Sequence, residues 1–144
     1  MKRLIYKLGF PIIKIYWFIF RPKIRGVKCV IQYQNKLLFV RHSYGTGRWT
    51  FPGGKIKSDE SAETAVKREV QEELGIELHA VVDFGEIYNE IYHKKDTITC
   101  FTARVENEEF KVDGEEIIEA KWFSIDDLPP MSDFVTEIYN LWKK

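Results

Sequence analysis

A chain of 144 residues, of which 44% are hydrophobic and 15% aromatic, is long enough to bury one substantial core. Residues 1–25 hold seven basic residues and no acid, whereas the remaining 119 carry 15 basic and 22 acidic residues, a net charge of −7. An acidic body argues against a general nucleic-acid binder, which needs a basic face, and suits a protein that receives an anionic substrate together with divalent cations.

The first predicted element is an apolar helix within residues 1–25, which also include a short connector. The stretch from Leu4 to Phe20 is almost wholly apolar or aromatic, but two lysines, a glycine and a proline interrupt it. It is too short and too interrupted for a transmembrane helix, and it lacks the small-residue cleavage site of a signal peptide. We therefore expect a cytoplasmic protein.

This N-terminal helix carries its charge on one face. At 100° per residue the basic side chains form a single stripe, made of Arg3, Lys7, Lys14 and Arg21. One interpretation is a helix that is kinked at Pro11 and packs on its own domain or on the second subunit of a homodimer. The other is an interfacial helix, in which residues 3–21 contact a membrane surface and the stripe meets anionic lipid.

The next predicted elements are a β-hairpin and a short strand that ends at two glycines. The β-rich stretches Gly26–Tyr33 and Lys36–His42 are separated by two polar residues, as in a hairpin. After a loop over Ser43–Arg48, Trp49–Phe51 reads as a short strand that ends at the Pro-Gly-Gly run of residues 52–54.

A helix over Ser61–Leu74 follows, and Gly75 closes it in the position where a left-handed residue commonly caps a helix. Leu78–Tyr92 and Thr97–Glu106 are predicted as longer strands, joined by a polar turn at His93–Asp96.

The last part of the chain predicts a strand at Ile117–Phe123 and an amphipathic helix at Ser132–Trp142. Strands mixed with helices indicate a layered α/β domain over residues 26–144. Cys29 and Cys100 lie far apart in β-rich stretches without a C-x-x-C pair, which indicates buried free thiols.

The helix at 61–74 carries acids on its apolar face. Its packing face consists of small and branched apolar residues, namely Ala62, Ala65, Val66, Val70 and Leu74. Glu69 and Glu73 project within roughly 20° of Ala62, and Glu72 lies at the edge of this face. The solvated face is supplied by other side chains, namely Thr64, Lys67, Arg68 and Gln71. The acids are therefore predicted to point inward.

Burying several carboxylates without compensation is costly, because desolvation and mutual repulsion add. A hard divalent cation accepts several carboxylate oxygens, so this pattern predicts metal binding. Gly53 and Gly54 leave the preceding backbone without bulky side chains, so that a carbonyl can approach a cation and an amide can approach a phosphate.

These residues together carry a family resemblance. Gly54, five residues, Glu60, seven residues and the run Arg68–Ile76 resemble the full signature of the Nudix hydrolases. The stretch Leu37–Arg41 and the run from Trp122 to Pro129 also resemble strands and a turn of that family. The resemblance covers roughly residues 26 to 143. It implies an α/β/α sandwich with a mixed sheet, and makes residues 26–144 a Nudix-like hydrolase domain.

The resemblance also implies roles. Glu69, Glu72 and Glu73 would hold Mg²⁺ or Mn²⁺ with the Gly53 carbonyl, while Arg68 and Glu60 would orient the acids. The implied reaction is hydrolysis of a pyrophosphate bond in a nucleoside diphosphate linked to another group. Glu69 is the first choice for the base and Glu72 the second.

Relatives also suggest an additional acid outside the helix. Glu116 is the candidate for a further metal ligand or base, and the alternative is a solvated acidic turn that begins at Asp113.

Substrate-binding candidates lead into the glycine run, where cations can meet phosphates and aromatics can stack on a base. They are Arg41, His42, Tyr44, Arg48, Trp49 and Gly54. The run Phe51–Lys55 resembles that of members acting on nucleoside triphosphates. Hydrolysis of dinucleoside polyphosphates or nucleotide sugars, action on RNA 5′ ends, and a non-catalytic nucleotide-binding or membrane-tethered module stay open as alternatives.

Overall fold

The computed structural model describes residues 9, 11–15, 23–44, 47–91 and 94–144. Most of the predicted N-terminal helix, Gly45 and Tyr92 lie outside these ranges. The elements, in chain order, are β1 (Lys23–Tyr33), β2 (Lys36–His42), β3 (Trp49–Thr50), β4 (Gly53–Lys55), α2 (Ala62–Leu74), β5 (Val82–Ile91), β6 (Lys94–Arg104), β7 (Ile117–Ser124) and α3 (Asp133–Trp142).

The strands form one mixed sheet with the order β3-β2-β1-β6-β5, in which β4 also pairs with β1 and β7 with β2. The β1–β6 pair is parallel and long, from Lys23 opposite Lys95 to Gln32 opposite Arg104. By contrast, β1 and β2 pair only beside their turn, at residues 32–33 and 36–37. Beyond the hairpin end the partner of β1 is β4, so the segment before α2 is built into the sheet.

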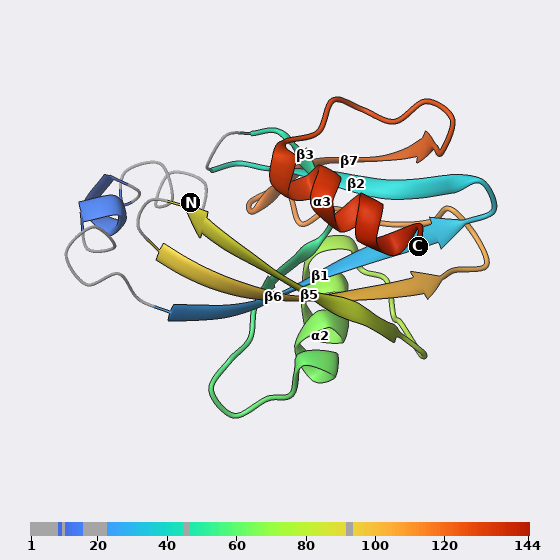
Figure 1. Ribbon diagram of the computed structural model, residues 1–144. Coiled ribbons are helices and arrows are strands. Elements are labelled where there is room, and N and C mark those ends of the chain that lie inside the picture. The colour runs from blue at the N-terminus through green and yellow to red at the C-terminus, as the bar shows by residue number, and fades with distance from the viewer. Residues whose placement is uncertain (1–8, 10, 16–22, 45–46, 92–93) are drawn as a thin grey trace.

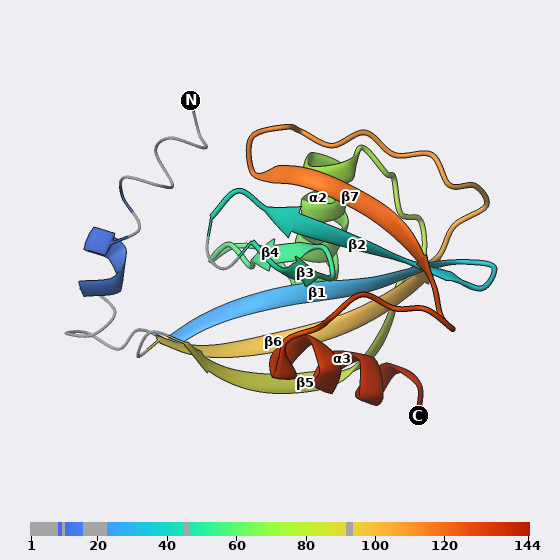
Figure 2. The same cartoon turned by 90° about the horizontal axis from the view of Figure 1, so that it is seen from above.

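One helix covers each face of the sheet. Figures 1 and 2 show α2 on one side of the strands and α3 on the other. Val27, Cys29 and Ile31 of β1 pack toward the cluster that includes the apolar face of α2. Val30 instead joins the cluster that includes Val135 and Ile138 of α3. Successive residues of β1 thus face opposite sides of the sheet, as the two-residue period of a strand requires. With a helix on each side, this confirms the predicted α/β/α sandwich with a mixed sheet.

Several predicted boundaries differ from the structure. β1 begins at Lys23, three residues before the predicted start at Gly26. Residues 53–55 form a strand instead of only ending one, because pairing with β1 satisfies their backbone groups. β5 begins at Val82, four residues later than predicted, although Leu78 is buried in the core. β6 begins at Lys94, so the predicted polar turn at His93–Asp96 is mostly strand. Cys29 and Cys100 are buried free thiols, as predicted.

The described part of the N-terminal segment, residues 11–15, is helical and stands apart from the sandwich in both views (Figures 1 and 2). Ile12 is 71% exposed and Ile15 61% exposed. Among the described residues, no helix combines the length and hydrophobicity needed to cross a bilayer. The exposure of Ile12 and Ile15 also means that these two side chains do not pack on the chain's own domain.

Candidate active site

The central element of the site is α2, and its sequence defines both of its ends. The hydroxyl of Ser61 accepts a hydrogen bond from the Thr64 N–H at 3.1 Å, which caps the first turn. Gly75 adopts the left-handed conformation with φ 64° and donates its N–H to the Gln71 carbonyl. Burial of the predicted apolar face then holds α2 on the sheet and carries Glu73 with it.

Glu73 is the most buried acid of this helix, with 1% of its surface exposed. Its Oε1 accepts a hydrogen bond from the Gly53 N–H at 3.0 Å. Its Oε2 is buried and has no hydrogen-bond partner. Burial raises the pKa of Glu73 well above its usual range, and the nearby charges of Glu69 and Glu116 act in the same direction. The predicted inward orientation is confirmed, and this carboxylate lacks one partner.

Glu69 lies against the second glycine of the run. Its side chain is 13% exposed. A Cβ atom on Gly54 would stand 2.6 Å from both carboxylate oxygens of Glu69, so only glycine leaves room for this carboxylate. Burial raises the pKa of Glu69, while the neighbouring guanidinium of Arg68 opposes that rise.

Arg68 hydrogen-bonds three acids of the site. Its guanidinium bonds both carboxylate oxygens of Glu60, at 3.0 and 2.6 Å, and also Glu69 at 2.9 Å and Glu72 at 3.3 Å. These hydrogen bonds hold the pKa of Glu60 at about 2. The prediction that Arg68 belongs to the solvated face is wrong. Its side chain is only 20% exposed, because the loop before α2 folds back and brings Glu60 over it.

A divalent cation fits these residues. The unpartnered Oε2 of Glu73 is a buried oxygen that a cation would satisfy, and Glu69 stands in a space that only glycine leaves open. Within the described residues, no three His, Cys, Asp or Glu side chains already converge as a ligand set. Glu69 and Glu72 are instead hydrogen-bonded to Arg68. Glu72 is 55% exposed and can turn inward.

Glu116 lies within electrostatic reach of the acids, because its charge raises the pKa of both Glu69 and Glu73. It is half-buried at the start of β7, and its carbonyl accepts the Ser43 N–H at 2.9 Å. The turn before it is organised by Asp113, whose Oδ1 accepts from the Glu115, Glu116 and Ile117 amides. Both the ligand interpretation and the acidic-turn interpretation of Glu116 therefore have support.

The substrate-binding candidates are brought together near β2 and β3, although several already have partners. The Arg41 guanidinium lies 5.5 Å from the Trp49 ring, donates to the Gly47 carbonyl at 3.1 Å and pairs with Glu119 at 3.7 Å. Trp49 packs edge-on against Phe123. Arg48 is exposed. Arg41 and Trp49 therefore act as one stacked unit.

His42 and Tyr44 form a second pair, with ring centroids 5.0 Å apart. Burial, helped by the charge of Lys28, lowers the pKa of His42 to about 3. Its Nδ1 is buried and has no hydrogen-bond partner. His42 is half-buried, and its lowered pKa favours the neutral imidazole.

Sequence reasoning missed Lys28. Its ammonium donates to the Phe51 carbonyl at 3.0 Å, and its charge acts on Glu73 and Glu69. A signal was available, because Lys28 is the single charged residue in the apolar run of residues 27–31. A lysine in a buried strand requires a partner of opposite charge.

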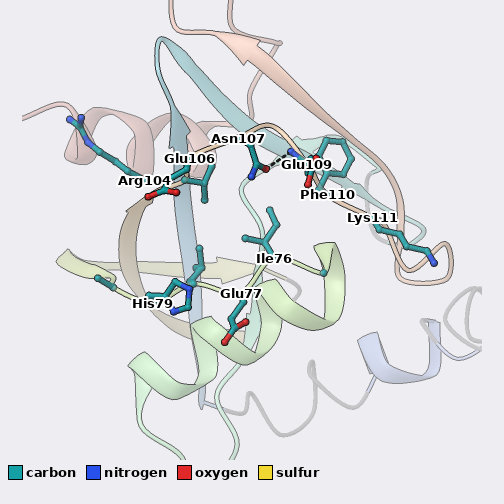
Figure 3. Close-up of a pocket in the computed structure, with 13 residues that line it drawn as sticks. Ile76, Glu77, His79, Arg104, Glu106, Asn107, Glu109, Phe110 and Lys111 are labelled. Carbon is teal, nitrogen blue, oxygen red and sulfur yellow. Dashed lines mark hydrogen bonds between the residues drawn. The ribbon is translucent and has the colours of Figure 1, made fainter.

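A separate cavity of about 790 Å³ lies beside the C-terminal end of α2 (Figure 3). It is lined by residues 75–80, 104–107 and 109–111, and we call it the loop cavity. Its acids, such as Glu77 and Glu109, belong to loops and are exposed. None of the acids gathered by Arg68 lines it. The loop cavity therefore lies apart from the acids that contact Arg68.

Comparison with known proteins agrees with this geometry. The profile of the NUDIX domain matches residues 22–141. The chain is 28% identical over 111 residues to the oxidized purine nucleoside triphosphate hydrolase of Danio rerio, a match covering 76% of this chain and 71% of that protein. It is 32% identical over 103 residues to the NAD-capped RNA hydrolase NudC of Vibrio vulnificus, covering 71% of this chain but only 39% of that protein.

Among solved structures, the MutT NUDIX hydrolase from Burkholderia pseudomallei superposes with a TM-score of 0.75 at 25% identity. The superposition covers 83% of this chain and 97% of that one.

Proposed function

We propose that this chain, which belongs to the Nudix hydrolase family, uses Mg²⁺ or Mn²⁺ to hydrolyse a pyrophosphate bond in a nucleoside diphosphate linked to another group. The observation that carries the proposal is Glu73, a buried carboxylate with one oxygen held by the Gly53 amide and the other without a partner. Such an arrangement is costly unless a cation completes it.

The cation would be held by Glu73 and Glu69, with Glu72, the Gly53 carbonyl and Glu116 as the further candidates. When bound, a divalent ion lowers the pKa of the attacking water and neutralises charge on the diphosphate. The glycines contribute space, because neither residue 53 nor residue 54 can carry a Cβ without a clash. Arg68 and Glu60 form a rigid pair beside these acids, which limits how far Glu69 can turn.

Glu69 is our first choice for the residue that takes the proton from the attacking water. It is largely buried, and that burial raises its pKa toward the range in which a carboxylate accepts a proton readily. Arg68 orients it through a 2.9 Å hydrogen bond. Glu72, our second choice, is more exposed and is held less closely, at 3.3 Å.

For the substrate we favour a nucleoside triphosphate with a modified base. Two observations support this class, namely the run Phe51–Lys55 and the similarity to a relative named for oxidized purine nucleoside triphosphates. The stacked Arg41–Trp49 unit and Tyr44 are the candidates for base and phosphate contacts, together with Arg48. Dinucleoside polyphosphates and nucleotide sugars are the alternatives. A capped RNA end, suggested by the other relative, fits the net charge of −7 on residues 26–144 less well.

A screen over these substrate classes, with Mg²⁺ and with Mn²⁺, tests the proposal. Nucleoside triphosphates, dinucleoside polyphosphates and nucleotide sugars are incubated with the full chain, and products are separated by chromatography. We expect metal-dependent release of a nucleoside monophosphate. A protein that binds nucleotide but turns over none of these compounds would instead be the non-catalytic module.

We further propose that the protein is cytoplasmic and that its N-terminal segment makes a peripheral contact with a membrane. Ile12 and Ile15 are exposed, and the sequence of residues 1–25 has seven basic residues and no acid. This combination fits an anionic lipid surface, whereas a homodimer contact needs the same isoleucines to be covered by a second copy. Co-sedimentation with anionic liposomes, comparing the full chain with a version lacking residues 1–21, separates the two. Equal partitioning removes the membrane proposal.

A further inference from the structure

Trp49 stands on an edge strand that is too short to orient its side chain by backbone pairing alone. β3 comprises two residues at the end of the sheet, and it pairs with β2 through Val40 opposite Thr50 and Arg41 opposite Trp49. Short edge segments with few hydrogen bonds open locally at little cost in free energy. The orientation of the Trp49 ring therefore depends on the side chains that contact it.

Two side chains contact the Trp49 ring. Phe123 lies edge-on to it, with ring centroids 5.1 Å apart and planes at 76°, and Phe123 in turn packs edge-on against the buried Phe39. This contact ties the indole to the core that α3 covers. The guanidinium of Arg41 lies 5.5 Å from the centroid of the same ring. Because residues directly opposite on antiparallel strands point to the same side of the sheet, the register of β2 and β3 makes this contact possible.

The Arg41 guanidinium is itself held by two further contacts. Its Nε donates to the Gly47 carbonyl at 3.1 Å, and its Nη1 lies 3.7 Å from a carboxylate oxygen of Glu119. Glu119 stands opposite Arg41 on β7, so Trp49, Arg41 and Glu119 form one row across three strands. A guanidinium is planar, with its donors in a fixed fork, and can therefore meet a carbonyl, a carboxylate and a ring together. These contacts use one donor and pair the charge that a substrate phosphate would otherwise meet.

Trp49 also forms part of the wall of a cavity. The cavity measures about 430 Å³, and Phe123, Leu128 and Pro130 are among the residues that line it together with Trp49. Arg41 is not part of this lining. An aromatic wall offers a face on which a nucleobase stacks, and the volume exceeds the roughly 300 Å³ at which small-molecule sites begin. A base can therefore reach the Trp49 ring through the cavity, whereas Arg41 stands outside it.

We propose that Arg41 is a positioning residue, which holds the Trp49 ring in the orientation at which the base of the substrate stacks on it and does not itself bind the substrate phosphates. Within the Arg41–Trp49 unit, Trp49 then contacts the base, and phosphate binding falls to Arg48, the exposed cation next to it in the chain. The contact with the base rests on the proposed function, whereas the hold of Arg41 on the ring does not need a substrate.

Two-dimensional ¹H–¹⁵N spectra of the tryptophan indole groups test the hold on the ring without substrate, and Trp49→Phe identifies the Trp49 signal. Arg41→Lys and Arg41→Gln should both shift this signal by similar amounts, because an ammonium keeps the charge but loses the planar stack and the Gly47 hydrogen bond. Glu119→Gln, which removes one contact of Arg41, should shift it less.

The matched control for these spectra is Arg104→Gln, an exposed arginine of the loop cavity, which should leave the Trp49 signal unchanged. A Trp49 signal that stays in place in Arg41→Gln or in Arg41→Lys overturns the proposal. If neither Arg41 variant folds, Glu119→Gln decides it in the same way.

Steady-state kinetics with the best substrate of the screen test the contact with the base. Arg41→Lys and Arg41→Gln should each raise KM by roughly fivefold or more and leave kcat within about twofold, because they weaken a contact that ground state and transition state share. In a Trp49→Leu background the further loss from Arg41→Gln should stay below about twofold, since Arg41 acts through the ring.

Additive losses in these kinetics, or a KM that Arg41→Lys preserves, would refute the proposal and make Arg41 a phosphate ligand. A protein that turns over no nucleotide would contradict the proposed function, and the indole spectra would still decide whether Arg41 holds the ring.

Discussion

The acid site, made of Glu60, Arg68, Glu69, Glu72 and Glu73, and the loop cavity both lie beside α2 and both contain carboxylates. The two regions differ in how far those carboxylates are buried. In the acid site Glu73 is 1% exposed with an oxygen that has no partner, and the Arg68 guanidinium hydrogen-bonds Glu69. In the loop cavity Glu77 is exposed to solvent, although the cavity measures about 790 Å³ (Figure 3). The buried acids, and not the loop cavity, therefore form the candidate active site.

The largest expected effect comes from replacing one glutamate by glutamine in each of the two regions. Glu73→Gln should lower kcat by about 10²-fold or more, on the scale of losing a preorganised electrostatic element. Glu77→Gln, four residues further along and lining the loop cavity, should leave kcat within about twofold. Steady-state kinetics with the best substrate of the screen measures both. Near-normal turnover by Glu73→Gln, or an equal loss in Glu77→Gln, would reverse the assignment of the two regions.

A single methyl group tests the tight packing of the acid site. In Gly54→Ala the new Cβ would stand 2.6 Å from the Glu69 oxygens, so the carboxylate must move aside. The end of a flexible side chain can give way, so folding should survive while kcat falls by roughly 10-fold to 10²-fold through misplacement. Gly9→Ala is the control, because nothing lies within 4 Å of its Cβ position. A thermal midpoint that collapses with the activity would instead make Gly54 a folding residue.

The smallest expected effect concerns the Glu60–Arg68 pair and depends on pH. The pKa of Glu60 is lowered to about 2 from 4.5, so its ionised form stabilises the fold above pH 4.5 and this contribution is lost as pH falls toward 2. Glu60→Gln in EDTA should therefore be less stable than the wild type at pH 7, and the difference should narrow below pH 4.5. Denaturant unfolding across pH 3 to 7 measures it. If the stability difference between Glu60→Gln and the wild type does not change with pH, the charge of Glu60 does not stabilise the fold.

Local patterns predicted the elements that depend only on neighbouring residues. The helix at residues 61–74, the left-handed Gly75 and the inward orientation of Glu69 and Glu73 all follow from patterns within one short segment. Boundaries that depend on distant partners were less well predicted. Residues 53–55 became a strand because β1 offered them hydrogen bonds, which no local pattern reveals. The Arg68 side chain is largely covered, contrary to the prediction, because the loop before α2 places Glu60 against its guanidinium.

The sequence by itself determined the family, the reaction class and the acids of the helix, because a helix fixes the relative directions of its own side chains. The tertiary structure alone decided which carboxylate is fully buried and which cation faces it. Lys28 and Glu73 are 45 positions apart in the chain. Both side chains hydrogen-bond the segment 51–53, because Lys28 donates to the Phe51 carbonyl and Glu73 accepts from the Gly53 amide. The pairing of β1 with β4 places that segment beside Lys28, and no local pattern predicts it.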